Sequence, residues 1–218
     1  MRIAPEGWPF ALPWLLPALL LLWLRQPVWA GVCLLAGVAT ALFFRDPRRS
    51  FDGPDDVVVA PADGRILKVD EVDADFAGAR RTRVVTFLSV FDVHLQRCPV
   101  GGEVVESRPR SGAKVAAFRP EADEVNEQRL TVIRTAAGEA IGIVQIAGLV
   151  ARRVVGYLRQ GERVERGQHL GLIKFGSRVD LLVPTGYIIE VGAGDRVRGG
   201  ATAVARPGPR AHGDDATR

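Results

Sequence analysis

Two long apolar stretches fill most of the first 44 residues and constrain the fold more than any other feature of the chain. Residues 8–24 read WPFALPWLLPALLLLWL and residues 27–44 read PVWAGVCLLAGVATALFF, without a single charge. Each stretch is at the short end of what crosses a bilayer as a helix, and only Arg25 and Gln26 separate them. We expect a helical membrane hairpin rather than a signal peptide, because the preceding segment is not notably basic and a second apolar stretch follows.

Arginines cluster where the second stretch ends. The segment RDPRRS at residues 45–50 contains Arg45, Arg48 and Arg49. Basic residues near the ends of membrane helices are enriched on the cytoplasmic side. We therefore expect residues 1–50 to attach the protein to the cell membrane, with the following domain facing the cytoplasm.

The composition argues against several kinds of site and partner. The formal net charge is +4, but no basic run is interleaved with aromatic residues, so nucleic acid is not an expected partner. Cys33 and Cys98 are the only cysteines and imply no disulfide framework. Asp92, His94 and Cys98 lie close in sequence, but their spacing matches no zinc site, so no metal is expected.

Residues 51–206 have the pattern of an all-β domain. Short β-branched runs alternate with turn residues about every ten positions, which indicates a sandwich or barrel. The longest run, RTRVVTFLSVFDVHLQRCP at residues 81–99, predicts one long strand with His94 in its middle. The tail at residues 207–218 is rich in Gly, Pro and charged residues and is expected to be disordered.

A short internal repeat refines this prediction. GERVERG at residues 161–167 and GDRVRGG at residues 194–200 share glycine, an acidic residue, Arg-Val and a final glycine. The pattern resembles the barrel-sandwich hybrid fold of biotinyl and lipoyl carrier domains. Such carriers need a modifiable lysine at a hairpin tip, and the sequence around Lys174 does not predict such a hairpin. We therefore expect the architecture without the carrier function.

An unusual interruption occurs in the apolar run LIKFGSRVDLLVP, where Gly176 and Ser177 stand inside what otherwise indicates a buried strand. A strand bulge is the simplest explanation. Asp63 in the turn PADG and His94 add a carboxylate and an imidazole, so the chain could supply an Asp-His-Ser set. Such a serine could attack the unhindered carbonyl of Gly176 in an intramolecular reaction.

Four segments together resemble the phosphatidylserine decarboxylase family in its short bacterial form. They are FFRDPRR, APADGRI, FLSVFDVHLQRCPVGG and GLIKFGSRVDLLVP, extending from residue 43 to residue 184. The resemblance implies a proenzyme that cuts itself between Gly176 and Ser177 into a β chain, residues 1–176, and an α chain, residues 177–218, which stay together as a heterodimer. Ser177 would become a covalent pyruvoyl cofactor, which forms a Schiff base with phosphatidylserine and yields phosphatidylethanolamine and carbon dioxide.

The resemblance also assigns the histidine of the long run to His94 and the PADG aspartate to Asp63. The sequence departs from the long-form enzymes in reading FGSR at the cleavage site and in placing Arg97 where they carry a second histidine. Either Asp63 or Asp92 could orient His94. Two alternatives to the expected activity are a membrane-anchored adaptor without enzymatic activity and a pyruvoyl decarboxylase of another amino-acid substrate.

Overall fold

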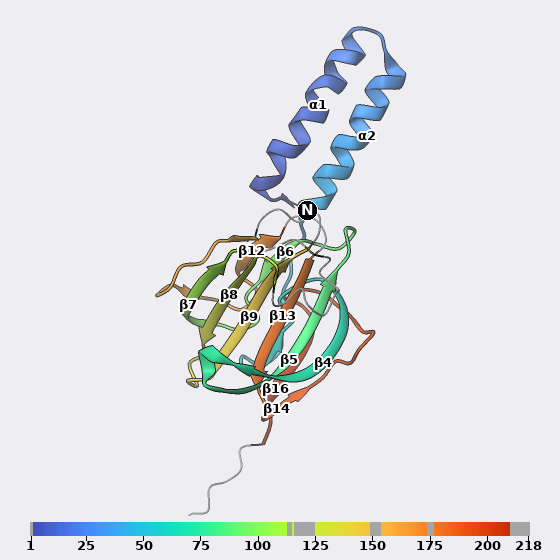
Figure 1. Ribbon diagram of the computed structural model, residues 1–218. Coiled ribbons are helices and arrows are strands. Elements are labelled where there is room, and N and C mark those ends of the chain that lie inside the picture. The colour runs from blue at the N-terminus through green and yellow to red at the C-terminus, as the bar shows by residue number, and fades with distance from the viewer. Residues whose placement is uncertain (1, 113–114, 116–124, 149–153, 174–176, 210–218) are drawn as a thin grey trace, which may run out of the picture.

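A pair of N-terminal helices projects from one end of a β domain (Figure 1). The computed structural model describes residues 2–112, 115, 125–148, 154–173 and 177–209. The expectation of an all-β domain preceded by a helical hairpin is confirmed. Lys174, Gly176 and the segment 210–218 of the expected disordered tail lie outside the described residues.

The hairpin consists of α1 (Trp8–Trp23), preceded by a 3-10 turn at Pro5–Gly7, and α2 (Pro27–Phe43). The chain reverses through Arg25, which adopts the left-handed conformation with φ 56°. Small residues allow the helices to pack closely: a Cβ added to Gly37 would lie 2.6 Å from the Leu15 side chain. Most large apolar side chains of both helices point outward and are exposed. Such a surface is suited to lipid rather than to water.

The β domain contains short strands of antiparallel pairing. The strands are β1 (Arg2–Ile3), β2 (Arg45–Asp46), β3 (Val58–Val59), β4 (Gly64–Ala74), β5 (Ala79–Leu88), β6 (Leu95–Arg97), β7 (Gly102–Arg110), β8 (Gln128–Arg134), β9 (Ala140–Ala147), β10 (Val154–Gly156), β11 (Arg163–Val164), β12 (His169–Ile173), β13 (Ser177–Pro184), β14 (Tyr187–Ile189), β15 (Arg196–Val197) and β16 (Ala203–Pro207). A 3-10 turn at Asp75–Ala77 joins β4 to β5. The pair β1-β2 closes the base of the hairpin.

The remaining strands form two units of the same topology. The large sheet has the order β11-β7-β8-β9-β13-β5-β4-β15, and β9 and β13 are its central strands. Outward from β9 lie β8, β7 and β11, and outward from β13 lie β5, β4 and β15, so the strands of one half correspond one by one to those of the other. The two small sheets, β10-β12-β6 and β14-β16-β3, correspond in the same way. One unit thus comprises residues 58–88 and 177–207, and the other comprises residues 95–173 and is inserted between these two segments. The main hydrophobic core includes buried residues of both units.

The two copies of the repeat occupy equivalent places in these units. Each contributes a short edge strand, β11 to β7 and β15 to β4. Their glycines at positions 161, 167, 194 and 200 all have φ between 74° and 99°, a region that residues with a Cβ rarely adopt. The repeated glycines therefore make the turns on either side of the two edge strands.

The expected single strand over residues 81–99 is wrong. β5 ends at Leu88, a turn follows, and His94 directly precedes β6. The turn is closed by the N–H of Asp92, which donates to the carbonyl of Ser89 at 3.0 Å. Val90 and Phe91 at its corners are apolar and carry no glycine or proline signal, so the sequence suggested a continuous strand.

A second, smaller core joins the hairpin to the β domain. Phe43 and Phe44 at the end of α2 pack with Ala4, Val93 and Leu95. This contact brings the base of the hairpin to the segment that contains His94. The same end of the molecule therefore carries both the apolar helices and the candidate site.

Candidate active site

Ser177 is the first residue of β13, a central strand of the large sheet. It pairs with Leu88 of β5 on one side and Ala147 of β9 on the other, at the end of the sheet nearer the hairpin (Figure 1). Its side chain is completely buried, and its Oγ has no hydrogen-bond partner within the described part of the chain. A buried hydroxyl without a partner is uncommon and unfavourable, so this serine calls for an explanation other than a structural one.

The two charges that follow Ser177 neutralise each other. Arg178 and Asp180 point to the same face of β13, and the guanidinium donates two hydrogen bonds of 2.6 Å to the carboxylate. Both side chains are buried. Arg83 lies 3.7 Å from the same carboxylate. The charged residues that interrupt the apolar run are therefore an internal ion pair.

Replacing Arg178 by methionine should lower the free energy of unfolding by about 3 kcal/mol, because the buried Asp180 carboxylate would lose the two 2.6 Å hydrogen bonds from this guanidinium. Thermal and urea unfolding of the full chain would measure the loss, best in a Ser177→Ala background where the chain is expected to stay whole. The double variant Arg178→Met/Asp180→Leu should recover much of it. A loss below about 1 kcal/mol for Arg178→Met would contradict the assignment, since that is typical of exposed pairs.

His94 lies beside both the hairpin and the segment that leads to Ser177. Its ring is stacked at a tilt on Phe43, with centroids 4.1 Å apart. Its carbonyl accepts a hydrogen bond of 3.4 Å from the N–H of Ile173, the last described residue before Ser177. Burial is the main cause that lowers the pKa of the imidazole to about 4. The ring is therefore neutral at pH 7.

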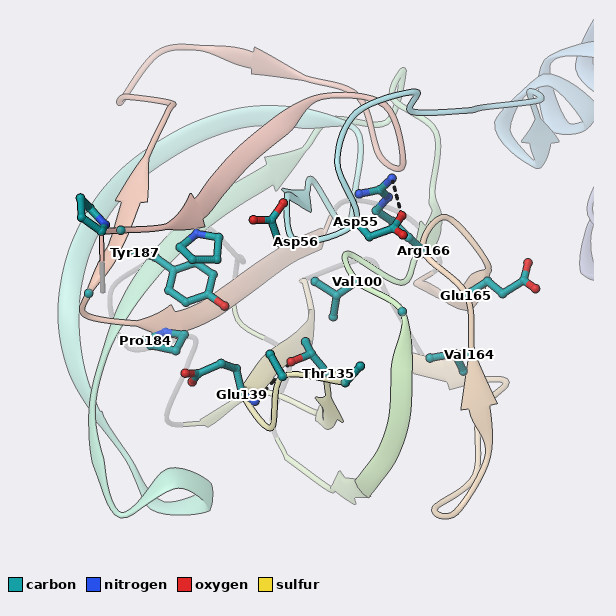
Figure 2. Close-up of a pocket in the computed structure, with 17 residues that line it drawn as sticks. Asp55, Asp56, Val100, Thr135, Glu139, Val164, Glu165, Arg166, Pro184 and Tyr187 are labelled. Carbon is teal, nitrogen blue, oxygen red and sulfur yellow. Dashed lines mark hydrogen bonds and ion pairs between the residues drawn. The ribbon is translucent and has the colours of Figure 1, made fainter. Parts of the chain in front are cut away.

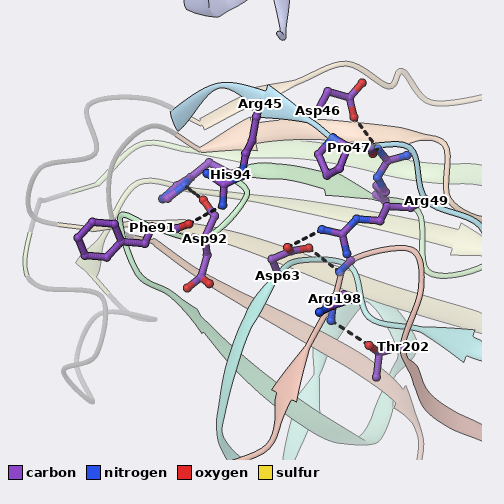
Figure 3. Close-up of polar contacts among 12 residues, drawn as sticks. Arg45, Asp46, Pro47, Arg49, Asp63, Phe91, Asp92, His94, Arg198 and Thr202 are labelled. Atoms are coloured by element: carbon purple, nitrogen blue, oxygen red, sulfur yellow. Dashed lines mark hydrogen bonds and ion pairs between the residues drawn. The ribbon is translucent and has the colours of Figure 1, made fainter. Parts of the chain in front are cut away.

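The imidazole is oriented by a backbone carbonyl. Nδ1 lies 2.9 Å from the carbonyl oxygen of Asp92 (Figure 3). A carbonyl oxygen only accepts, so Nδ1 carries the hydrogen and Nε2 is the basic nitrogen. The Asp92 carboxylate instead accepts hydrogen bonds from the N–H and the Oγ of Ser89 at 2.8 and 2.7 Å.

Asp63 is held by groups other than His94. One oxygen accepts from Arg49 at 2.8 Å and the other accepts from the N–H of Gly199 at 2.8 Å. Figure 3 shows this carboxylate between Arg49 and the turn that contains Arg198. The structure thus joins Asp63 to the basic segment after the hairpin, and it places neither aspartate carboxylate in a described hydrogen bond to the imidazole.

Arg97 takes part in a second ion-pair cluster at the base of the hairpin. Its guanidinium donates to Asp46 at 2.6 Å and to the carbonyls of Pro47 and Gly167 at 2.9 Å each. His169 lies 3.3 Å from the same Asp46. Arg97 therefore connects the segment after α2 to the β domain.

Two buried glutamines were not anticipated from the sequence. The Gln96 amide donates to the carbonyl of His94 at 2.8 Å, and the Gln145 amide donates to Gln96 Oε1 at 2.9 Å. Both side chains are completely buried, and Gln145 Oε1 has no partner among the described residues. The only sequence signal was a single glutamine inside each apolar run. They fix the backbone of His94 from within the core.

A cavity of about 710 Å³ lies away from these residues. Pro184 and Tyr187 line it at the far end of β13 from Ser177, together with Asp55, Asp56 and Arg166 (Figure 2). Over the described ranges, no group of three or more His, Cys, Asp and Glu side chains is arranged to hold a metal ion.

Comparisons with known proteins agree with the segments quoted above. The family described as phosphatidylserine decarboxylase matches residues 38–205. A phosphatidylserine decarboxylase proenzyme of Nitrosomonas eutropha is 40% identical over 203 residues, covering 93% of this chain and 94% of its own. The proenzyme of Symbiobacterium thermophilum is 42% identical over 207 residues, covering 94% and 95%. That of Saccharopolyspora erythraea is 42% identical over 208 residues, covering 92% and 86%. The chain belongs to the phosphatidylserine decarboxylase family.

Proposed function

We propose that this protein cleaves itself between Gly176 and Ser177 and then decarboxylates phosphatidylserine to phosphatidylethanolamine. The observation that carries the proposal is Ser177 itself, whose buried Oγ has no partner among the described residues at the start of a central strand. A structural serine would bond to its surroundings. Membership of the family named for this decarboxylase supports the substrate.

The proposed self-cleavage needs a nucleophile and a base. Attack of Ser177 Oγ on the Gly176 carbonyl would transfer the acyl group from nitrogen to oxygen. Loss of the Ser177 α-proton then expels the Gly176 carboxylate and leaves dehydroalanine, which tautomerises and takes up water, releasing ammonia and leaving a ketone. His94 is the candidate base, because it is neutral at pH 7 and the Asp92 carbonyl fixes its tautomer.

The surroundings of Ser177 fit a covalent pyruvoyl group. The residue sits in an apolar, buried environment between Leu88 and Ala147, so a small neutral group in its place meets no charge from these neighbours. Such a group supplies a carbonyl that captures a primary amine and draws electrons away from the bond to the departing carboxylate. The chain contributes a buried site and a fixed strand, and Gln96 and Asp92 hold the backbone and ring of His94.

The N-terminal helices suit a lipid substrate. The segment Pro5–Trp23 is long and apolar enough to cross a membrane, and Pro27–Phe43 is a shorter apolar helix. We propose that this hairpin holds the protein on the cell membrane with the β domain on the cytoplasmic side, the side favoured by Arg45, Arg48 and Arg49. A pyruvoyl decarboxylase of a soluble amino acid would have no use for such an anchor.

We also propose that the two fragments stay together after cleavage. β13 would begin the α chain, yet it is hydrogen-bonded to β5 and β9, which both belong to the β chain. Its core-facing residues Val179, Leu181 and Val183 are buried. The heterodimer is thus the same β domain with one bond cut.

Chemical trapping tests the proposed function. The purified α chain should resist Edman degradation, because conversion of Ser177 removes its α-amino group. Cyanoborohydride added together with phosphatidylserine should join the lipid covalently to the α chain and stop turnover. Phosphatidylcholine, which lacks a primary amine, is the matched control and should leave the fragment unmodified. An α chain that begins with an ordinary serine amine would refute the mechanism.

A further inference from the structure

The turn after β5 presents two apolar side chains to the outside. Ser89–Asp92 form this turn, with Val90 51% exposed and Phe91 84% exposed. Turns usually contain Gly, Pro, Asn, Asp or Ser, which tolerate both the backbone geometry and water. Phe91 is the most exposed large apolar residue of the described chain. Most of the Phe91 ring is therefore not packed against any described part of the protein.

The turn is held in one shape by its own polar residues. The Asp92 carboxylate accepts from the N–H and Oγ of Ser89, and the Asp92 N–H donates to the Ser89 carbonyl at 3.0 Å. Three hydrogen bonds therefore close the turn and direct Val90 and Phe91 away from the β domain. An apolar tip on so well-bonded a turn resembles a built contact surface more than a frayed loop.

The same turn is fastened to the base of the hairpin. Arg45 donates one hydrogen bond to the carbonyl of Phe91 at 2.5 Å and another to the carbonyl of Leu42 in α2 at 2.9 Å (Figure 3). Leu42 is itself exposed, as are most large apolar side chains of the two helices. The tip therefore continues the apolar surface of the hairpin onto the β domain. Arg48, which follows α2 in the chain, is exposed and positively charged, which suits an anionic lipid surface.

We propose that Val90 and Phe91 insert into the lipid bilayer next to the hairpin and set the depth at which His94 meets the lipid head groups. The inference rests on the proposed function and adds a second point of membrane contact to it. Asp92 links the two roles, because it closes the turn through its carboxylate and holds Nδ1 of His94 through its carbonyl at 2.9 Å. Membrane contacts at both the hairpin and the turn fix the tilt of the β domain relative to the membrane. The hairpin alone would not fix this tilt.

A depth measurement tests the insertion without using catalysis. A nitroxide spin label on Phe91→Cys, in a Cys33→Ala background of the full chain in phosphatidylserine-containing vesicles, should be accessible to oxygen and shielded from a water-soluble nickel complex. Cys98 is completely buried and should not react. Ile188→Cys is the control, because Ile188 is 41% exposed on β14, away from the hairpin (Figure 1). Equal exposure of both labels to nickel would overturn the proposal.

Kinetics with two forms of the substrate supply the second test. Phe91→Ser should raise the KM for phosphatidylserine in vesicles by about tenfold, the factor expected for losing the burial of one large side chain. With water-soluble dihexanoyl phosphatidylserine, kcat/KM should stay within about twofold, as for other surface substitutions. Ile188→Ser should change neither. Equal losses on both substrates, or on neither, would overturn the proposal. A wild-type protein inactive on both would instead refute the proposed function, while the spin-label result would still report the depth.

Discussion

The Ser177→Ala variant should remain a single chain of 23.6 kDa and show no decarboxylation. Alanine removes the proposed nucleophile and the precursor of the ketone. The fold should tolerate the change, because the lost Oγ has no described hydrogen-bond partner and removing such a group leaves nothing unsatisfied. Gel electrophoresis and intact mass would show one species, which should unfold cooperatively on heating.

Ser177→Cys is the matched control for this experiment. A thiol of similar size keeps a nucleophile at the same position, so the variant should still cleave, although a cysteine-derived terminus need not support turnover. A Ser177→Ala protein that still splits at this bond would end the proposal. A wild-type protein that stays whole would favour the non-enzymatic adaptor.

The second large effect is expected at His94. His94→Gln should slow self-cleavage by about a hundredfold or more, the usual contribution of a general base. A time course of cleavage after synthesis in a cell-free system would measure the rate. Glutamine retains an amide N–H that can donate to the Asp92 carbonyl, so a loss of rate reports the missing base rather than a disrupted turn. Cleavage of His94→Gln at the wild-type rate would remove His94 from the mechanism.

The pH profile separates this role from a structural one. The pKa of His94 is about 4 because of burial, so the wild-type cleavage rate should stay level as pH falls from 7 and decline only near pH 4. An unfolded histidine takes up its proton near pH 6.5. The unfolded state therefore binds more protons between pH 6.5 and 4, and the stability is complete above this range and decreases as pH falls through it. His94→Gln should lose that part of the pH dependence.

Variants of the two aspartates should differ from each other. Asp63→Asn weakens the pair with Arg49, which joins the basic segment to the β domain. Asp92→Asn keeps the carbonyl that holds His94 but weakens the closure of the turn by Ser89. The same cleavage assay would show whether cleavage depends more on the Arg49–Asp63 pair or on the closed Ser89–Asp92 turn, since neither carboxylate is in a described hydrogen bond to the imidazole.

Local patterns in the sequence were sufficient for much of the fold. Uninterrupted apolar stretches predicted the hairpin, and short β-branched runs separated by turn residues predicted the all-β domain. The turn at Ser89–Asp92 escaped prediction because its exposed Val90 and Phe91 have the character of strand residues. Apolar residues can be exposed where a protein contacts a membrane, and the order of apolar residues along the chain does not distinguish this case from burial in a strand.

The candidate site was predictable in its nucleophile but not in its supporting contacts. Ser177 stood out because a hydroxyl beside charged residues interrupts an apolar run. The partners of Asp63 are Arg49 and Gly199, which lie 14 and 136 positions away, so no spacing rule could find them. Gln96 and Gln145 are 49 positions apart, and each is the single glutamine of its strand. They belong to two different sheets, the small sheet that contains β6 and the large sheet that contains β9, so only the complete fold brings them together.

The insertion of one β unit inside the other gives the proposed cut a consequence for folding. In the intact chain, residues 58–88 come first, the inserted unit follows, and residues 177–207 come last. The pairing of β13 between β9 and β5 is therefore an intramolecular step. After cleavage the same step joins two separate molecules, and its rate depends on their concentration. The proposed conversion would also change the Ser177 terminus chemically, so the original bond could not re-form. Processing would therefore be irreversible. The protein would fold once as a single chain and then be cut, whereas separated fragments could regain this arrangement only by bimolecular association.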